Sequence, residues 1–291
     1  MKVAVVGPGA MGCLFAARLA RGGTKTFLVD YKADRAARLN TSGVRVEDEE
    51  GVWTAKPEVV TAVPPAVDLV IVLTKAYSTG RLRFPPEVPV LTLQNGLGNV
   101  ETLCSMVGSA RVLVGVTSEG ATALGEGHVR HAGTGATCLG AWTSSSPEEA
   151  VNALRNAGFD VEATEAPGQL VWEKVAVNAA INPLTAILNV PNGMLLELKD
   201  VRQLMRDLVV EAAKVASTEG YRFAQSLVET TEEVCRNTAS NISSMLQDIR
   251  AGKPTEIDAI SGEILRRAQL ASLPAPRTRV VYQLVRGLEH H

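Results

Sequence analysis

Short apolar runs alternate with amphipathic stretches over the first half of the chain. Residues 2–6 predict a buried strand, and similar runs follow at 26–29, 67–73, 88–93 and 110–116. Helix-like segments lie between several of these runs, and strands that alternate with helices are typical of βαβ units and a parallel sheet. The pattern therefore predicts an α/β domain in this part of the chain.

The pattern changes after the segment Glu165–Gly168. From Gln169 onward apolar residues recur at helical spacing, and we find no clear strand. The longest such pattern runs from Val201 to Ala216 and ends at Gly220, a residue type that often follows the last turn of a helix. We expect three segments: an α/β domain at 1–166, an all-helical domain at 167–287 and a purification-tag remnant at 288–291.

Composition excludes several classes of protein. The 291 residues include 29 Lys and Arg against 31 Asp and Glu, so the net charge of −2 gives no sign of a nucleic acid partner. No apolar run approaches the roughly 18 residues that a membrane span needs, and the first apolar stretch is too short for a signal peptide. We therefore expect a cytoplasmic protein that binds neither nucleic acid nor membrane.

Cysteine and histidine give little support for a metal site. The four cysteines have no metal-ligand or redox-motif spacing, which favours reduced structural thiols. Outside the tag remnant the only histidines are His128 and His131. We therefore expect no metal and no Ser-His-Asp triad, so any acid–base chemistry should come from another type of residue.

A glycine motif, Gly7-x-Gly9-x-x-Gly12, follows the first predicted strand and opens a predicted helix. Asp30 ends the next strand, which completes the fingerprint of a dinucleotide-binding, Rossmann-type unit. Free N–H groups and the helix dipole favour an anion at such a helix start, where a pyrophosphate would rest. The loop residues expected to contact the cofactor are Gly7, Pro8, Gly9, Ala10, Met11 and Gly12.

The residues around Asp30 leave the choice of cofactor open. An acid at this position usually accepts a hydrogen bond from the ribose 2′-hydroxyl and selects NAD over NADP. Lys32 and Arg35 follow closely and could instead hold a 2′-phosphate. The pattern alone favours NAD.

Two other predicted strands are followed by polar residues, Lys75 in one case and Asn95 in the other. Ligands of doubly wound sheets bind outside the carboxyl ends of the strands, which favours both residues as parts of a binding site. A solvated loop lysine and an ordinary Asn-Gly turn are the simpler alternatives.

Three polar residues recur at a spacing of four in an otherwise apolar predicted helix. Lys174, Asn178 and Asn182 share one face of that helix. Buried amides and a buried ammonium need partners, so an internal polar cavity that holds a ligand explains them best, and a thin solvated stripe is the alternative. Pro183 cannot donate to the helix and predicts a kink beside Asn182.

Further polar positions are ambiguous on their own. Asn192 reads most simply as part of a turn with Gly193. Asn241 and Ser244 share the polar face of a short predicted helix, which could equally be an ordinary exposed face. Glu256 falls in the predicted first turn of a helix after Thr255, where negative charge is favourable in any case.

Together these segments resemble the ketopantoate reductase (2-dehydropantoate 2-reductase) family. The resemblance spans nearly the whole chain in the right order, and its motifs in the helical half are more specific than the glycine motif. The matching segments are the glycine motif, 75–76, 94–98, 119–121, 172–186, 191–193, 241–248 and 255–258.

The resemblance implies a Rossmann-type domain followed by an all-helical domain like the C-terminal domain of 6-phosphogluconate dehydrogenase. It implies the NADPH-dependent reduction of 2-dehydropantoate, a small 2-oxo acid, to pantoate on the route to pantothenate and coenzyme A. It is also compatible with a homodimer. Family members often carry an arginine near the position of Asp30 to hold the 2′-phosphate, and the acid here keeps NADH open as an alternative.

The resemblance also assigns roles to individual residues. Lys174 matches the proton donor, and Ala121 and Glu256 match positions near the nicotinamide. Asn95 matches a position between cofactor and substrate. The positions that match substrate contacts are Asn178, Asn182, Asn192, Asn241 and Ser244.

A lysine has the chemistry that such a reduction needs. When hydride adds to the C2 carbonyl, negative charge develops on the oxygen, and a protonated lysine can stabilise that charge and donate a proton. A lysine with an ordinary pKa is already protonated at neutral pH. Glu256, if close, could orient the ammonium of Lys174, while the amides and Ser244 would hold the substrate's carboxylate and hydroxyl.

Two other functions stay as alternatives. The first is another NAD(P)-dependent 2-oxo acid, hydroxy acid or opine dehydrogenase on the same two-domain plan, which a panel of substrates would separate. The second is a non-catalytic regulator that senses NADP, although such a protein has no need of a buried lysine.

Overall fold

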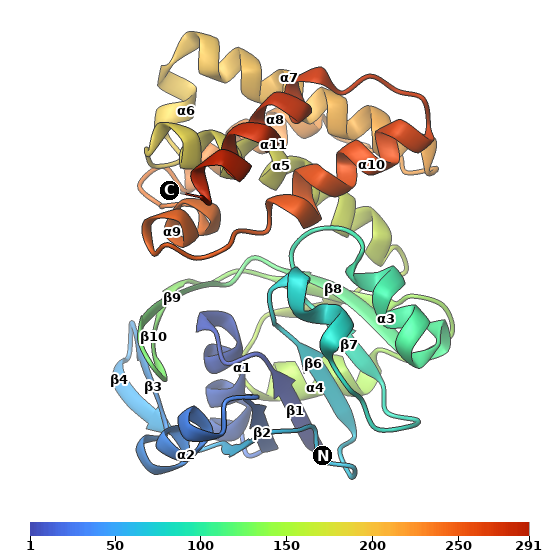
Figure 1. The fold of residues 1–291 in the computed structure, drawn as a ribbon. Coiled ribbons are helices and arrows are strands. Elements are labelled where there is room, and N and C mark those ends of the chain that lie inside the picture. The colour runs from blue at the N-terminus through green and yellow to red at the C-terminus, as the bar shows by residue number, and fades with distance from the viewer. Residues whose placement is uncertain (291) are drawn as a thin grey trace. The chain divides into compact units, whose positions relative to one another are not determined.

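The computed structural model describes residues 1–290, which form two units by their contacts (Figure 1). The first unit contains Met1–Gln94 and Asn99–Gly168, and the second contains Asn95–Gly98 and the chain from Gln169 onward. Each unit has its own hydrophobic core, as domains do. The observed division falls after Gly168, with Asn95–Gly98 grouped with the helical half.

A mostly parallel eight-stranded sheet lies at the centre of the first unit, in the order β12-β11-β8-β7-β6-β1-β2-β5. Of its neighbouring strands only β11 and β8 run antiparallel. The order from β5 to β8 is that of a doubly wound Rossmann-type sheet, so the predicted fold is confirmed. The strands are β1 (Lys2–Val6), β2 (Lys25–Val29), β5 (Glu58–Val60), β6 (Leu69–Val72), β7 (Val90–Thr92), β8 (Val112–Thr117), β11 (Thr137–Ala141) and β12 (Val161–Ala163).

Continuous apolar runs form the central strands because both faces of the sheet are covered. The last four residues of β1 are buried, and so are all residues of β6 and β7. The helices of this unit are α1 (Ala10–Arg21), α2 (Ala33–Ser42), α3 (Asn99–Val107) and α4 (Glu148–Asn156), with 3-10 turns η1 (Ala76–Arg81) and η2 (Ser109–Arg111).

A second, four-stranded sheet in this unit has the order β4-β3-β10-β9. The sequence pattern does not reveal it, because its strands are partly exposed and carry charged residues. Glu47 on β3, for example, accepts a hydrogen bond from Arg130 on β10 at 3.1 Å. The strands are β3 (Val44–Asp48), β4 (Gly51–Ala55), β9 (Gly120–Gly125) and β10 (His128–Gly133).

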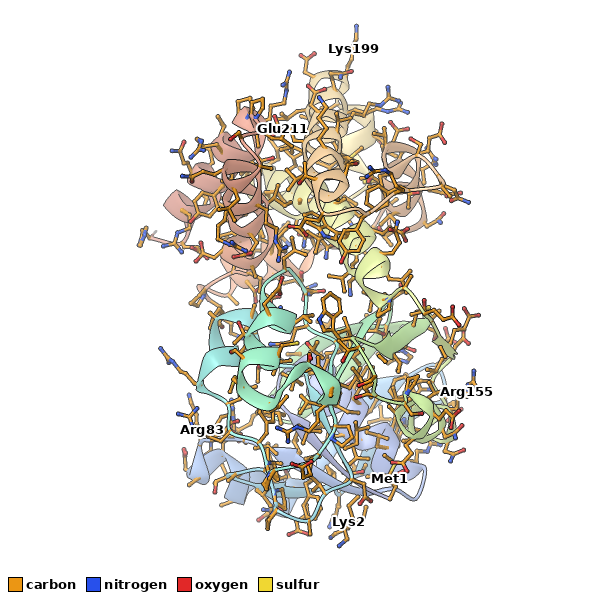
Figure 2. The ribbon with its side chains drawn as sticks, turned by 90° about the vertical axis from the view of Figure 1, so that its right-hand side faces the viewer. Met1, Lys2, Arg83, Arg155, Lys199 and Glu211 are labelled. Atoms are coloured by element: carbon orange, nitrogen blue, oxygen red, sulfur yellow. The ribbon has the colours of Figure 1, made fainter. Side chains whose placement is uncertain are left out.

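Helices joined by loops make up the second unit, which has no strand among the residues that the structure describes. The predicted helix at Val201–Ala216 is confirmed as α7 (Lys199–Thr218), and Gly220 follows it with a φ of +90°. Lys199 and Glu211 mark two positions along α7 in Figure 2. The remaining elements are α5 (Pro167–Leu188), α6 (Met194–Glu197), α8 (Leu227–Asn237), α9 (Ser244–Arg250), a π-helical turn η3 (Asp258–Gly262), α10 (Glu263–Leu270) and α11 (Pro276–Leu288).

Helix α5 is apolar around most of its circumference and supplies much of the second core. It continues through Pro183, and the kink expected there stays a prediction, because a proline can bend a helix without ending it. One turn of it is supported by Thr185, whose hydroxyl donates to Ile181 O at 2.9 Å. Among residues 1–290, no helix is long and apolar enough to cross a membrane.

Candidate active site

The glycine loop after β1 is shaped by two close approaches, at Gly7 and at Gly12. Gly7 has a φ of +109°, and a Cβ on it would lie 2.8 Å from the backbone nitrogen of Thr74. A Cβ on Gly12 would lie 1.8 Å from Gly7 O, so only glycine lets α1 pack this closely on the loop. A Cβ on Gly9 would meet nothing within 4 Å. The loop is therefore tight on its inner side and open at Gly9.

The start of α1 suits an anionic ligand. The helix begins directly after Gly9 without a side-chain cap, and its first turn, which contains Ala10 and Met11, has no acidic residue. Backbone N–H groups and the helix dipole at such a terminus favour phosphate. Pro8 lies on the loop and accepts a hydrogen bond from the thiol of Cys13 at 3.6 Å through its carbonyl oxygen. These residues fit the pyrophosphate of a dinucleotide.

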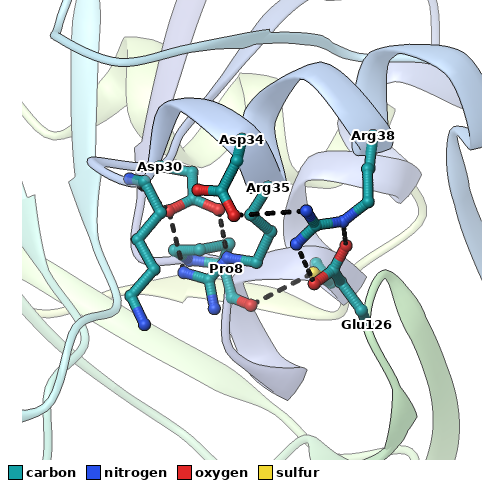
Figure 3. A network of polar contacts seen from close by, with 8 residues as sticks. Pro8, Asp30, Asp34, Arg35, Arg38 and Glu126 are labelled. Atoms are coloured by element: carbon teal, nitrogen blue, oxygen red, sulfur yellow. Dashed lines mark hydrogen bonds and ion pairs between the residues drawn. The ribbon is translucent and has the colours of Figure 1, made fainter.

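Asp30 follows β2 directly, and its carboxylate is 1% exposed. Figure 3 shows it facing Arg35 of α2, which donates through Nε to Oδ2 and through Nη2 to Oδ1 at 2.8 Å. The backbone N–H of Lys32 also donates to Oδ1, at 3.0 Å. The acid that the sequence identifies as the ribose ligand is thus present at the expected strand end, held by an arginine.

Gln94 joins the ends of two neighbouring strands of the large sheet. Its Nε2 donates to Thr74 O and to Thr79 Oγ1, both at 2.9 Å. This ties the end of β7 to the loop after β6, which contains the partly exposed Lys75 at the start of η1. Sequence reasoning did not single out Gln94, although it lies beside Asn95 in a matching motif.

Ala121 lies on β9, opposite His131 of β10, and packs against the first core. The ring of His131 donates to the buried carboxylate of Glu119, just before β9. This buried pair anchors the strand that positions Ala121.

The segment that contains Asn95 belongs to the second unit. The backbone N–H of Leu97 donates to Ala259 O at 2.8 Å, and a Cβ on Gly96 would lie 2.7 Å from Ala259 Cβ. Gly96 also has a φ of +88°, so both the backbone conformation and the close contact with Ala259 require glycine there. Asn95 therefore shares a unit with Lys174 and Glu256.

The predicted polar stripe lies on α5. Lys174 and Asn178 are partly exposed and Asn182 is buried, with a spacing that puts all three on one face. Loss of hydration lowers the pKa of Lys174 to about 8, and the nearby charge of Glu256 opposes this by raising the pKa. Glu256 is buried and precedes η3, so it lies before the helix rather than in its first turn.

Asn192 is both a turn residue and a buried one. Met194 N donates to Pro191 O across the turn, at 3.2 Å. The Asn192 side chain donates from Nδ2 to Thr238 Oγ1 at 2.9 Å, while its Oδ1 is buried without a hydrogen-bond partner. A buried carbonyl oxygen that lacks a donor is available to a ligand hydroxyl.

The structure brings Asn192 and Asn241 together, because the backbone N–H of Asn192 donates to Asn241 O at 3.0 Å. Asn241 lies before α9 and not on it, so the predicted shared helix face with Ser244 is wrong. The helix begins at Ser244, and Ser243 caps it by accepting from Leu246 N at 3.2 Å. The sequence does not single out Ser243 as the N-cap, because four residues suited to that position stand close together: Ser240, Asn241, Ser243 and Ser244.

The structure gives no sign of a metal centre in the part of the chain that it describes. No group of three or more His, Cys, Asp or Glu side chains among residues 1–290 could hold a metal ion. All four cysteines are free, and burial raises the pKa of the Cys13 thiol to about 12 and that of Cys235 to about 11.

A Rossmann-type unit with a dinucleotide loop and a helical unit with a lysine beside a glutamate define a two-domain nicotinamide-dependent oxidoreductase. The family model for "Ketopantoate reductase PanE/ApbA" matches residues 3–144, and that for "Ketopantoate reductase PanE/ApbA C terminal" matches residues 168–289. The chain belongs to the ketopantoate reductase family, which confirms the predicted resemblance.

Individual relatives agree with this assignment. The chain is 36% identical to 2-dehydropantoate 2-reductase of Halobacterium salinarum, over 98% of each chain. A solved PanE/ApbA family ketopantoate reductase from Ralstonia eutropha has a TM-score of 0.90 at 30% identity, covering 100% of this chain and 99% of that one. A D-mandelate dehydrogenase solved with NADH and anilino(oxo)acetate has a TM-score of 0.93 at 27% identity, with the same coverage.

Proposed function

We propose that this protein reduces 2-dehydropantoate to pantoate with NADPH, a step toward pantothenate and coenzyme A. The observation that carries the proposal is the ammonium of Lys174, poorly hydrated and close to Glu256, on one helix face with Asn178 and Asn182. The family assignment and the 2-dehydropantoate 2-reductases among the relatives support this substrate. Asp30 admits NADH as a second cofactor.

The residues of the first unit fit a nicotinamide dinucleotide. The loop from Gly7 to Gly12 and the uncapped start of α1 would hold the pyrophosphate, and Asp30 would face the adenosine ribose. Lys75 and Ala121 would line the rest of the cofactor site. When bound, the nicotinamide supplies the hydride.

Lys174 would complete the reduction by moving one proton. As the C2 carbonyl carbon gains hydride, its oxygen takes a proton from Nζ of Lys174, which becomes a neutral amine. With a pKa of about 8, this ammonium is still mostly protonated at neutral pH, and it releases a proton more readily than an ordinary lysine. Glu256 keeps the proton on Lys174 until the oxygen becomes basic.

The amides and Ser244 would bind and orient the oxo acid. Asn192 offers a buried oxygen that can accept from a hydroxyl, and the amide groups of Asn178 and Asn182 can donate to a carboxylate. Asn95, Asn241 and Ser244 would complete the set.

The test is an assay of 2-dehydropantoate with NADPH and NADH side by side, followed by nicotinamide absorbance. Turnover of 2-dehydropantoate well above that of other 2-oxo acids supports the proposal. The likeness to D-mandelate dehydrogenase favours one second candidate, a reductase of aromatic 2-oxo acids, so phenylglyoxylate belongs in the substrate panel. Preference for phenylglyoxylate would replace the proposed substrate, and cofactor binding without any turnover would favour a regulator.

A further inference from the structure

The carboxylate of Asp30 is already engaged in the structure. Oδ1 accepts from Lys32 N and Arg35 Nη2, and Oδ2 accepts from Arg35 Nε. A carboxylate has room for about four hydrogen bonds. Asp30 can therefore still accept one from a ribose hydroxyl, as an NAD-selecting acid does.

The negative charge of Asp30 is also neutralised, by the guanidinium of Arg35. A bare acid at this strand end disfavours NADP because it repels the 2′-phosphate. Here the guanidinium of Arg35 meets both oxygens in a fork, the strongest geometry for such a pair. The pair carries no net charge, and the Arg35 side chain is 30% exposed while Asp30 is buried. The positive member therefore lies on the solvent side.

Arg35 also lies near the phosphate-binding loop. Burial raises the pKa of the thiol of Cys13, in the first turn of α1, and the nearby charge of Arg35 opposes this rise. Two further acids lie close to Arg35, and Arg38 donates to both: to Glu126 at 2.7 and 2.9 Å and to Asp34 at 3.2 Å. Arg38 therefore offsets part of the negative charge that these two carboxylates place near Arg35.

We propose that Arg35 determines cofactor selectivity: by clamping Asp30, it lets one site accept either a ribose 2′-hydroxyl or a 2′-phosphate. This rests on the proposed function, because it needs a nicotinamide dinucleotide at the loop. The protein then binds NADPH and NADH with dissociation constants within about tenfold of each other, about 1.4 kcal/mol.

The test measures Kd for NADPH and NADH by quenching of protein fluorescence or calorimetry, without oxo acid. In Arg35→Met the bare carboxylate repels the 2′-phosphate, so Kd for NADPH should rise at least about tenfold while Kd for NADH changes far less. In Asp30→Asn the freed arginine should tighten NADPH and the lost acceptor should weaken NADH. The matched control is Arg21→Met in the last turn of α1, whose side chain is exposed and pairs with Glu50, and it should leave the ratio unchanged.

The outcomes separate the two proposals. If neither nucleotide binds the unaltered protein, the proposed function fails and this inference fails with it. If both bind but Arg35→Met leaves the ratio of Kd values unchanged, or weakens both nucleotides equally, the inference alone is overturned. If Arg35→Met has a much lower melting temperature than the unaltered protein, the ratio of the two Kd values is measured in Asp30→Asn and Arg35→Lys instead. Arg35→Lys should retain NADPH binding because it keeps the positive charge.

Discussion

Glu256 lies close enough to Lys174 to raise the pKa of its ammonium, against the burial that lowers this pKa to about 8. In the folded protein the lysine therefore holds its proton less tightly than in the unfolded chain. The folded state gains stability as pH rises from about 8 towards 10.5, and a charged Lys174 costs stability below that window. A charged group that costs stability in the folded protein points to a role other than stability.

We predict that Lys174→Met lowers kcat for the oxo acid at least about a hundredfold, the low end for loss of a general acid. The melting temperature at neutral pH should stay equal or rise, because the variant removes a poorly hydrated charge. Steady-state kinetics and a thermal melt on the same sample check both parts. Near-normal turnover in a folded variant would remove Lys174 from the chemistry.

The pH profile of the reduction should report Lys174. Because the protonated amine is the active form, kcat/KM should be level below its pKa and fall above about 8. In Glu256→Gln the carboxylate no longer raises the pKa of Lys174, so the falling limb should move to lower pH. A limb that stays in place, with only a uniform drop in rate, would show that Glu256 does not act through the charge of Lys174.

The sequence predicts the glycine loop and five of the eight strands of the large sheet, because these depend on local signals. Five apolar runs became β1, β2, β6, β7 and β8, and the loop needs glycine for reasons that act within a few residues. The sequence does not reveal β5, β11 and β12 of the large sheet or the strands of the second sheet, because short or half-exposed strands lack a clear period of apolar residues. Asp30 was identified, but its bond with Arg35 depends on how α2 packs.

For the candidate site in the helical unit, the sequence predicts which residues take part but not the hydrogen bonds that hold them. A spacing of four was enough to align Lys174, Asn178 and Asn182 on α5. The partners of Asn192 come from a segment far along the chain, so no local pattern could reveal Thr238. The sequence places Glu256 in the first turn of a helix, whereas the observed helical segment begins after it with a π-helical turn, which apolar periodicity does not distinguish from an α-helix.

Thr238 should act as a positioning residue for Asn192. Its hydroxyl accepts from Asn192 Nδ2 at 2.9 Å and donates to Val234 O at 2.6 Å. We predict that Thr238→Val raises KM for the oxo acid about fivefold, the effect of one neutral hydrogen bond, with kcat little changed. Thr238→Ser keeps the hydroxyl and should restore KM. If valine and serine give the same KM, the hydroxyl does not position Asn192.

Acid should weaken the helical unit through Glu232 of α8. This carboxylate accepts from Arg202 and Arg206 of α7, and these bonds lower its pKa from 4.5 to about 2. A lowered pKa adds stability above pH 4.5 that is lost as pH falls towards 2. The contribution should be about 2 kcal/mol, less than the full shift implies because the arginines are exposed.

Denaturant unfolding across this pH range, compared between the unaltered protein and Glu232→Gln, measures that contribution. The difference in unfolding free energy between the two should be largest near neutral pH and shrink as the carboxylate is protonated. A difference that does not change with pH would mean that Glu232 stabilises α8 by packing and not by charge.

Two glycines of the same loop should respond to alanine in opposite ways. At Gly12 a Cβ would lie 1.8 Å from Gly7 O, so Gly12→Ala should push α1 from the loop and lower the melting temperature by several degrees or more. At Gly9 a Cβ meets nothing within 4 Å and φ is −77°, so Gly9→Ala should melt normally. The added methyl would instead stand where the pyrophosphate approaches, so Kd for the dinucleotide should rise at least about tenfold. Normal dinucleotide affinity in Gly9→Ala would place the pyrophosphate away from the open side of this loop.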